Sequence, residues 1–525
     1  MRLRQSSLIV IATLIAGSAG AVAANATPAE DSPGRARRHV VLVVWDGMRP
    51  DFVSPKYTPT LEQLARDGVL FRDHHSVYPT ATDVNGAALA TGCYPNRNGL
   101  AANLEFRPAI NLRQPIDMGD PDSIKRGDQV SGGKYLTMPT FVELLRAAGK
   151  KVALVGTKSV AMLFDRHNDW TYTRIKGKPL TIFAAAPLTS SARDEMIKLL
   201  GSIPDDPGAT SAQRSHFATR ALTEFLWRDG VPDFSLLWLS EPDLAEHNFA
   251  PGSPEAIAAI KTVDDDLATL LRALEEKNVR DSTDILVVSD HGFSTIRRSI
   301  DVVALLNKAG FHAAKEISEK PNPGDILVCG NAGTVLFYVR DHDPKVTQRL
   351  VDWLEESDFV GMMFTRDKIG GTPSLDQIQL RTPNSADVVM AFRGSEERNQ
   401  FGLPGMIDAD WNRKAGEGTH AALSHFDVNN TLIAAGPDFP RGLKTLDPTG
   451  NIDIAPTILG ILRANASTMD GRRLDNTMDG RGESQRTVAR TLEADYGTWR
   501  ARVEITSFGG STYIEAVKPL PQDSK

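Results

Sequence analysis

The sequence predicts an α/β fold with a doubly wound, mostly parallel central sheet flanked by helices. Three segments, "RHVVLVVWDG" (Arg38–Gly47), "DFSLLWLSEPD" and "TDILVVSDHG", contain continuous apolar runs rather than alternating patterns. Such runs are typical of strands buried on both faces of a parallel sheet. Segments with helical spacing lie between them, and this alternation favours a doubly wound sheet. The chain of 525 residues is 41% hydrophobic and 24% charged, so it can form a large core.

The other elements can be placed in order along the chain. "TPTLEQLARDGV" follows the first strand with helical spacing and closes at a glycine. We expect a short helix over Val84–Ala90, a helix over Pro139–Ala148 that precedes a strand over Val152–Val155, and a long helix over Pro254–Lys277. "NNTLIAAGPDFP" and "DIAPTILGILR" predict one more core strand and one more helix.

Departures from this pattern predict the domain organisation. We expect the catalytic core to comprise 39–300 and 417–486, with a smaller inserted subdomain over 301–416. Within the core, the polar segment Glu105–Leu136 is expected to be a long surface insertion. The tail over 487–525 is expected to hold one weak helix and a strand at "STYIEAV".

The N-terminal segment has the pattern of a secretory signal peptide over 1–26. Arg2 and Arg4 precede the apolar stretch Leu8–Ala23, and small residues suited to cleavage follow. A membrane anchor is the alternative, but the stretch is short and diluted by Gly, Ser and Ala. We therefore expect an exported protein, periplasmic or secreted, with a disordered lead-in over 27–38 and no transmembrane segment in the mature chain.

Charge and cysteine content exclude some classes of function. The net charge of −7 without a long basic run argues against a nucleic-acid-binding surface. The two cysteines, Cys93 and Cys329, are too few for a disulfide scaffold or a cysteine-rich zinc site. They could pair in an exported protein, but the sequence does not place them within bonding distance.

Acidic and imidazole side chains follow the C-terminal ends of the predicted strands, where open α/β sheets bind their ligands. The candidate ligands, which have no lysine or arginine directly beside them in the sequence, are Asp46, Asp243, His247, Asp290, His291 and His420. Each alone has an ordinary interpretation as a turn residue or a solvated pair. His425 is a rival to His420.

Together these residues predict a metal centre. Clustered carboxylates stay ionised only with compensating charge, and a set of carboxylates and imidazoles without cysteine suits Zn²⁺ or a similar divalent ion. There are enough ligands for two ions. Two metals about 3.5–4 Å apart can hold both the attacking and the leaving oxygen of an in-line displacement, which is phosphoryl or sulfuryl transfer chemistry.

Two hydroxyls precede the helix expected at Val84–Ala90. Thr80 and Thr82 lie where free backbone N–H groups and the helix dipole would favour an anionic substrate. One of them could be the nucleophile of a metal-dependent hydrolase. The alternative is that either threonine only caps the helix.

A set of motifs carries a family resemblance over most of Arg38–Leu474. "VVLVVWDGMRPD", "YPTATDVNGAALATGCYPNRNGL", "SEPDLAEHN", "VSDHGF" and "GEGTHA" resemble, in order and approximate spacing, the motifs of the alkaline phosphatase superfamily. The greatest similarity is to its nucleotide pyrophosphatase/phosphodiesterase branch. The resemblance implies that Thr82 is the nucleophile and a metal ligand, and that Asn103 hydrogen-bonds a phosphoryl oxygen. It also implies one metal held by Asp46, Asp290 and His291, and a second held by Asp243, His247 and His420.

Several positions depart from that branch. Asp83 replaces the phenylalanine that usually follows the nucleophile, so the pocket for a leaving nucleoside differs. Glu246 and Ala421 replace glycines beside expected ligands. Lys158 resembles a lysine that some monoester-cleaving relatives place near phosphate, but Val160 stands where those relatives have an arginine.

The sequence thus predicts an exported, two-zinc phosphoric ester hydrolase of the phosphodiesterase/nucleotide pyrophosphatase type. It would act through a phospho-threonine intermediate on a small phosphate ester, a class that includes nucleotides. A phosphomonoesterase of the same superfamily is the first alternative. A non-catalytic, metal-stabilised binding protein of this fold and an enzyme that transfers a phosphorus-containing head group to an alcohol are the others.

Overall fold

The computed structural model describes residues 37–166, 171–175, 178–185, 190–204, 209–466, 468–474, 487–496 and 499–520. The signal peptide expected at 1–26 lies outside the described residues, and so does the lead-in expected at 27–38 apart from its last two residues. Within the described ranges, no helix has both the length and the apolar character needed to cross a membrane.

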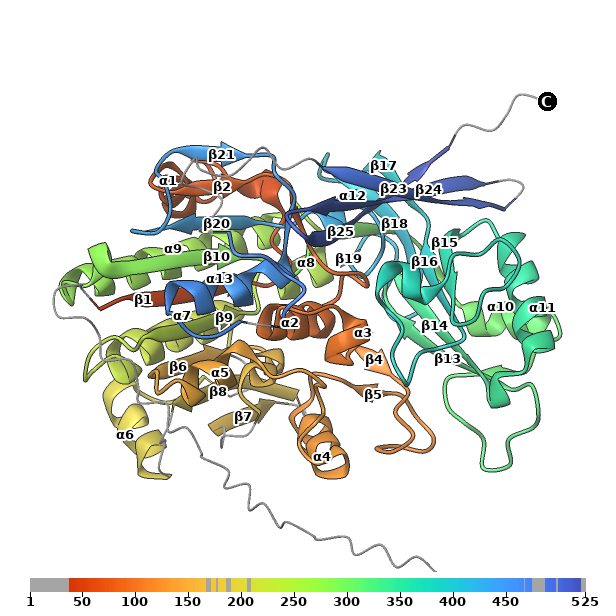
Figure 1. Cartoon of the computed structure of the whole chain (residues 1–525), viewed down its shortest axis with the longest axis horizontal. Helices are drawn as coiled ribbons and strands as arrows, with labels where there is room; N and C mark the ends of the chain where they lie inside the picture. Colours follow the sequence, from red (N-terminus) through yellow and green to blue (C-terminus); the bar gives the residue numbers. More distant parts are fainter. Residues whose placement is uncertain are drawn as a thin grey trace, which may run out of the picture. The chain divides into compact units, whose positions relative to one another are not determined.

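A nine-stranded sheet forms the centre of the fold (Figure 1). Its middle strands are mutually parallel and are, in spatial order, β10 (Thr283–Val288), β1 (His39–Trp45), β9 (Phe234–Leu239) and β6 (Val152–Gly156). All residues of these strands are buried. The continuous apolar runs therefore do mark strands covered on both faces, and the predicted fold class is confirmed.

Two strands run against the common direction of the sheet. β20 (Leu432–Ala435) is antiparallel to β10 and to β2 (Val69–Phe71), and β8 (Lys178–Ala185) is antiparallel to β6 and to β7 (Thr171–Ile175). β21 (Leu443–Thr445) lies parallel to β2 at the edge. The late core strand expected from the sequence is thus present. It runs antiparallel to β10, because the chain enters β20 beside the residue where β10 ends.

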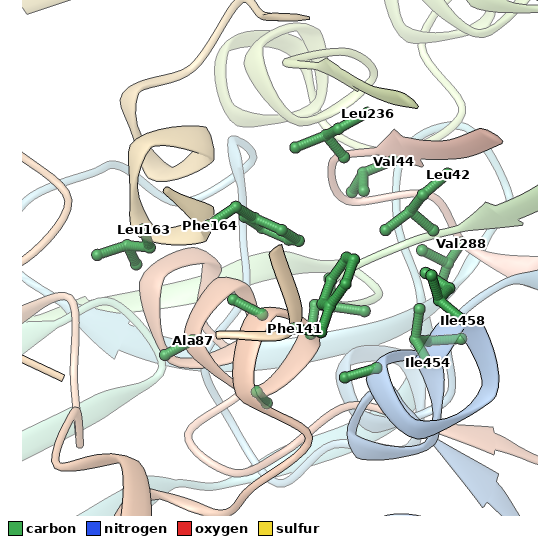
Figure 2. Packing of buried hydrophobic residues seen from close by; sticks show 14 of the residues in the cluster. Leu42, Val44, Ala87, Phe141, Leu163, Phe164, Leu236, Val288, Ile454 and Ile458 are labelled. Carbon is green, nitrogen blue, oxygen red and sulfur yellow. The ribbon is translucent and has the colours of Figure 1, made fainter. Parts of the chain in front are cut away.

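One face of the sheet packs on α2 (Thr82–Thr91), α5 (Phe141–Ala147) and α13 (Ile454–Ile461). All residues of α2 are buried, so this helix lies wholly inside the protein. Figure 2 labels buried side chains from this core: Leu42, Val44, Ala87, Phe141, Leu163, Phe164, Leu236, Val288, Ile454 and Ile458. The expected helices at Val84–Ala90 and Pro139–Ala148 are confirmed with shifted ends.

The other face packs on α1 (Pro59–Arg66), α7 (Ser211–Arg220) and α9 (Pro254–Glu276). α9 begins cleanly because the Ser253 hydroxyl accepts a hydrogen bond from the backbone N–H of Ala256. The two faces have separate cores, since alternate residues of β1 belong to one cluster and to the other.

The segment after β10 forms two further sheets. A four-stranded sheet contains β17 (Gly394–Arg398), β18 (Pro404–Asp410), β11 (Ser294–Ile300) and β19 (Gly418–Thr419). A five-stranded sheet contains β12 (Ala313–Ala314), β13 (Ile326–Asn331), β14 (Thr334–Val339), β16 (Val388–Phe392) and β15 (Val360–Thr365). The latter has helices α10 (Val302–Lys308) and α11 (Pro344–Glu355) in the same core cluster.

The last described part of the chain is a three-stranded antiparallel sheet. It consists of β23 (Val488–Asp495), β24 (Arg500–Phe508) and β25 (Ser511–Pro519). The strand expected at "STYIEAV" is confirmed, whereas the expected weak helix is wrong. Buried and exposed positions alternate along most of β24, which is the period of a strand with one covered face.

Two further expectations concern the segment Glu105–Leu136 and the cysteines. The segment is more than a surface insertion, because Met118, Ile124 and Tyr135 are buried in the main core. Cys93 and Cys329 are both buried free thiols. They therefore do not form the disulfide that an exported chain would have allowed.

Candidate active site

The predicted acidic residues meet at one edge of the sheet. Asp46 follows β1, Asp243 follows β9 as the first residue of α8 (Asp243–Phe249), and Asp290 follows β10. These three strands are parallel neighbours, so their carboxyl ends lie side by side. Gly47 makes the turn after β1 with a φ of 78°, and its N–H donates to Asp290 Oδ1 at 3.1 Å.

Asp46, Asp290 and His291 form the first ligand group, with ligand atoms within 4.8 Å of one another. His291 Nε2 lies 3.3 Å from Asp290 Oδ2 and 3.7 Å from Asp46 Oδ1. His291 Nδ1 lies 2.9 Å from the carbonyl oxygen of Gly292, so the donor on Nδ1 leaves Nε2 free to coordinate. All three side chains are fully buried.

Asp243, His247 and His420 form the second ligand group. Asp243 Oδ1 lies 3.3 Å from His247 Nε2 and 3.5 Å from His420 Nε2. Both imidazoles again turn Nδ1 toward a backbone carbonyl, that of Gly418 for His247 and that of Thr80 for His420.

The structure brings His420, and not its rival His425, into a ligand group. His425 is exposed at the start of a short helix and belongs to neither ligand group. His420 instead stacks on His291, with ring centroids 3.7 Å apart and planes 15° apart. The stacked rings bring the two groups into direct contact.

The donor sets fit divalent cations. Asp243 Oδ1 and Asp290 Oδ2 are buried without a hydrogen-bond partner, yet each faces imidazole nitrogens. Buried carboxylate oxygens normally have a partner, and these two atoms are available to a cation in each group. Carboxylates and imidazoles without thiols are ligands of Zn²⁺.

Thr82 is the first residue of α2, and its hydroxyl points to the ligand groups. Thr82 Oγ1 lies 3.1 Å from His291 Nε2 and 3.2 Å from Lys158 Nζ. The interpretation of the threonines as helix caps is wrong: the N-cap residue is Ala81, and the Thr80 hydroxyl donates to the carbonyl of Ala422.

Lys158 places a positively charged side chain among the acidic residues. The sequence around the predicted strand ends did not indicate this. Its ammonium lies 2.9 Å from Asp46 Oδ1 and 2.8 Å from Asp243 Oδ2, so it bridges the two ligand groups. The acidic cluster therefore does have a basic residue beside it. The signal was the position of Lys158 two residues after β6, a fourth parallel strand that ends at the same edge.

Burial and neighbouring charges set the protonation of the site. Burial, reinforced by Asp290, raises the pKa of Asp46, and burial also raises the pKa of Asp290. Burial acts in the same direction on Asp243, but the charge of Lys158 helps to outweigh it, so the pKa of Asp243 is lowered. Burial lowers the pKa of His420, which favours the neutral imidazole that a metal needs.

A cavity of about 480 Å³ is lined by all three members of the second ligand group and by Thr82. Of the predicted site residues, its lining contains Thr82, Asn103, Asp243, His247 and His420. Lys158 also lines it. Asn103 Oδ1 accepts a hydrogen bond of 2.8 Å from the backbone N–H of Asp83. This contact fixes the carbonyl end of the Asn103 amide and directs its NH₂ end away from Asp83.

The rest of the cavity wall comes from segments without recognisable motifs. Asp117 and Asp120 line it from the segment after β4 (Leu104–Glu105), and Asn331 and Arg413 line it from the segment after β10. No local pattern distinguishes these residues in the sequence, because only the fold brings them to the cavity.

The chain was compared with known families and proteins. The profile of the family described as type I phosphodiesterase/nucleotide pyrophosphatase matches residues 40–368. The chain is 24% identical over 268 residues to venom phosphodiesterase 2 of Crotalus adamanteus, covering 49% of this chain and 27% of that protein. It is 25% identical over 259 residues to ectonucleotide pyrophosphatase/phosphodiesterase family member 1 of Homo sapiens, covering 48% and 23%. The matched region thus spans about a quarter of the length of these relatives.

Solved structures show the same fold. Murine ectonucleotide pyrophosphatase/phosphodiesterase 5, in an inactive form with a threonine-to-alanine substitution and in complex with AMP, superposes with a TM-score of 0.57. The sequence identity is 16%, and the match covers 83% of this chain and 97% of the murine chain.

Proposed function

Because the chain belongs to the type I phosphodiesterase/nucleotide pyrophosphatase family, we propose that it is a metal-dependent hydrolase of phosphoric esters. One observation carries the proposal: the Thr82 hydroxyl lies at a helix start, 3.1 Å from an imidazole of one ligand group, and Thr82 lines a cavity together with the other group. This combination supplies a nucleophile, cation sites and space for a substrate. A binding protein would have no need of the hydroxyl.

We assign two Zn²⁺ ions to the site. One would be held by Asp46, Asp290, His291 and Thr82, and the other by Asp243, His247 and His420. Bound there, the ions would act as Lewis acids that stabilise the attacking and leaving oxygens of the displacement.

The protein groups then have distinct roles. Thr82 Oγ1 attacks phosphorus, the ester oxygen leaves, and a phospho-threonine forms; water then hydrolyses it and regenerates the hydroxyl. The Asn103 amide donates to a phosphoryl oxygen and stabilises its developing charge. The Lys158 ammonium, 3.2 Å from Thr82 Oγ1, stabilises negative charge on the nucleophile and on the transferring group.

A diester or pyrophosphate is the proposed substrate, in accord with the names of the relatives and with the AMP bound to the murine protein. The position of Lys158 favours a second candidate, a phosphomonoesterase, because an extra cation beside the nucleophile suits the additional charge of a monoester. Val160 opposes this candidate, since it replaces the arginine of monoester-cleaving relatives.

A paired assay tests the proposal. Purified protein loaded with Zn²⁺ is given bis-p-nitrophenyl phosphate and p-nitrophenyl phosphate, and Thr82→Ala is compared with the wild type and with Thr82→Ser. We expect faster diester hydrolysis, its loss in Thr82→Ala and partial activity in Thr82→Ser. Unchanged turnover in Thr82→Ala contradicts the nucleophile, and a strong monoester preference selects the second candidate. Product analysis with an added alcohol detects transfer in place of hydrolysis.

We also propose that the protein is exported by cleavage of the segment 1–26. The apolar stretch after two arginines supports this assignment. N-terminal sequencing of the protein recovered from outside the cytoplasm tests it, because the mature chain is expected to begin near residue 27.

A further inference from the structure

A third group of metal-ligating side chains lies away from the catalytic cavity. Asp73, His75 in β3 (His74–His75) and Glu515 in β25 have ligand atoms within 4.8 Å of one another. His75 Nε2 lies 3.1 Å from Glu515 Oε2 and 3.6 Å from Asp73 Oδ1. The group shares no residue with either of the other two ligand groups, and none of its members lines the cavity that contains Thr82.

The imidazole of this group is oriented as in the catalytic groups. His75 Nδ1 lies 2.9 Å from the carbonyl oxygen of Thr449, which leaves Nε2 directed at the two carboxylates. The same orientation by a backbone carbonyl is seen at His247, His291 and His420. In the catalytic groups the separations from Nε2 to carboxylate oxygen are 3.3–3.7 Å, close to the 3.1 and 3.6 Å at His75.

The carboxylate of Glu515 is also held in place. Its Oε1 accepts a hydrogen bond of 2.9 Å from the Thr506 hydroxyl, while Oε2 faces His75. The Tyr513 ring stacks on the His75 ring, with centroids 5.7 Å apart. Outer hydrogen bonds that fix the ring and the carboxylate are typical of metal ligands, because they preset the orientation that coordination requires.

We propose that Asp73, His75 and Glu515 bind a Zn²⁺ ion that joins the C-terminal three-stranded sheet to the core. One imidazole and two carboxylates without a thiol form a donor set that suits Zn²⁺. The Asp73 side chain is 35% exposed and that of Glu515 is 24% exposed, so the ion can enter and water can complete the tetrahedron.

The competing interpretation is an ion pair of protonated His75 with the two acids. The neighbouring charged or titratable groups are His74, His425 and Lys518. Zn²⁺ takes the place of the proton on His75 Nε2, so binding releases a proton to solvent and strengthens as the pH rises. The metal and the ion pair therefore predict different zinc contents.

Zinc content distinguishes the two. The full chain is stripped with a chelator, reloaded with Zn²⁺, freed of excess and analysed by mass spectrometry for bound zinc. We expect His75→Gln to bind one Zn²⁺ fewer per chain than the wild type, and Glu515→Gln to hold that ion at least about tenfold more weakly. Both variants should hydrolyse esters within about threefold of the wild type.

Two controls keep the result interpretable. His425→Gln, which changes a neighbouring exposed histidine outside the group, should keep the wild-type zinc content. The loss of hydrolysis in Thr82→Ala tests the catalytic proposal alone. Anomalous scattering at the zinc edge from wild-type crystals should place a peak between His75 and Glu515, even if a variant fails to fold. Equal zinc in the wild type and His75→Gln, or no such peak, overturns the third site.

Discussion

The proposed catalytic ligand groups and the Asp73–His75–Glu515 group share an arrangement of imidazoles and carboxylates but differ in their surroundings. In both, a carbonyl-bound imidazole directs Nε2 at carboxylate oxygens 3.1–3.7 Å away. One of the proposed catalytic groups lines a cavity of about 480 Å³ and the other contacts the Thr82 hydroxyl, whereas the third group lies between β3 and β25. Ligand geometry alone thus does not distinguish the proposed catalytic groups from the third group; the nearby hydroxyl and cavity do.

The test with the largest expected effect replaces one histidine of each kind of group by glutamine. We expect His291→Gln to lower kcat/KM by at least about 10³-fold, because it removes a ligand in contact with Thr82, and His75→Gln to change it by less than about threefold. Ester hydrolysis is measured with bound zinc counted in the same samples. Similar losses in both variants would remove the distinction between a catalytic and a structural site.

The second test removes the amide beside the nucleophile. Asn103→Ala should lower kcat by about 10²-fold with little change in KM, because the amide stabilises charge that develops only in the transition state. Steady-state kinetics on the diester provide the measurement. Bound zinc should stay at the wild-type level, and a rise in KM alone would indicate that Asn103 only binds the ground state.

The third test concerns Lys158, whose ammonium contacts one carboxylate in each of the proposed catalytic groups. Lys158→Met should lower the free energy of unfolding of the metal-free protein by about 3 kcal/mol, because it leaves Asp46 and Asp243 buried without their partner. This value is at the low end of such effects because Lys158 is 25% exposed. Urea unfolding in chelator measures it, and Zn²⁺ should restore most of the loss. Lys518→Met near the third group is the control, with a change below about 1 kcal/mol.

The smallest effect is expected in the pH dependence of the third group. Although burial opposes protonation, the hydrogen bond that His75 donates to Glu515 raises the pKa of His75 from 6.5 to about 9, so its contribution to stability is complete below pH 6.5 and disappears as the pH rises through 9. Burial acts to raise the pKa of the Glu515 carboxyl, but the hydrogen bond from His75 and its charge lower that pKa from 4.5 to about 2. The contribution of Glu515 to stability is therefore complete above pH 4.5 and is lost as the pH falls through 2.

In chelator, wild type should therefore exceed His75→Gln in stability by about 2 kcal/mol between pH 4.5 and 6.5, with the difference fading toward pH 9. With Zn²⁺ the difference should persist at pH 9, because the ion replaces the proton. Urea unfolding at several pH values measures both. A difference that fades equally with and without Zn²⁺ would reduce the third group to an ion pair.

Much of the fold was predictable because its central strands carry strong local patterns. Strands β1, β9 and β10 contain the long apolar runs that are typical of strands covered on both faces. The direction of β20 was not predictable, because an apolar run does not indicate whether a strand pairs in parallel or antiparallel. The weak helix expected in the C-terminal segment was wrong, because tertiary pairing in β23 and β24 overrides local preference.

The convergence of the acidic site residues was predictable for a related reason. Parallel strands deliver their carboxyl ends to one edge, so Asp46, Asp243 and Asp290 could be expected to meet. The contact of Lys158 with two carboxylates was missed, although the same rule applied to β6. The third group could not be found at all, because His75 and Glu515 are 440 positions apart and neither follows a central strand.

That separation has a consequence for synthesis on the ribosome. His75 and Asp453 are buried residues of the core whose side chains meet Glu515 and Tyr513 of β25. His75 precedes Glu515 by 440 residues and Asp453 precedes Tyr513 by 60 residues. The nascent protein therefore lacks these two contacts until β25 has been synthesised. Maturation of this part of the core must therefore follow the synthesis of residue 515, however early the catalytic sheet assembles.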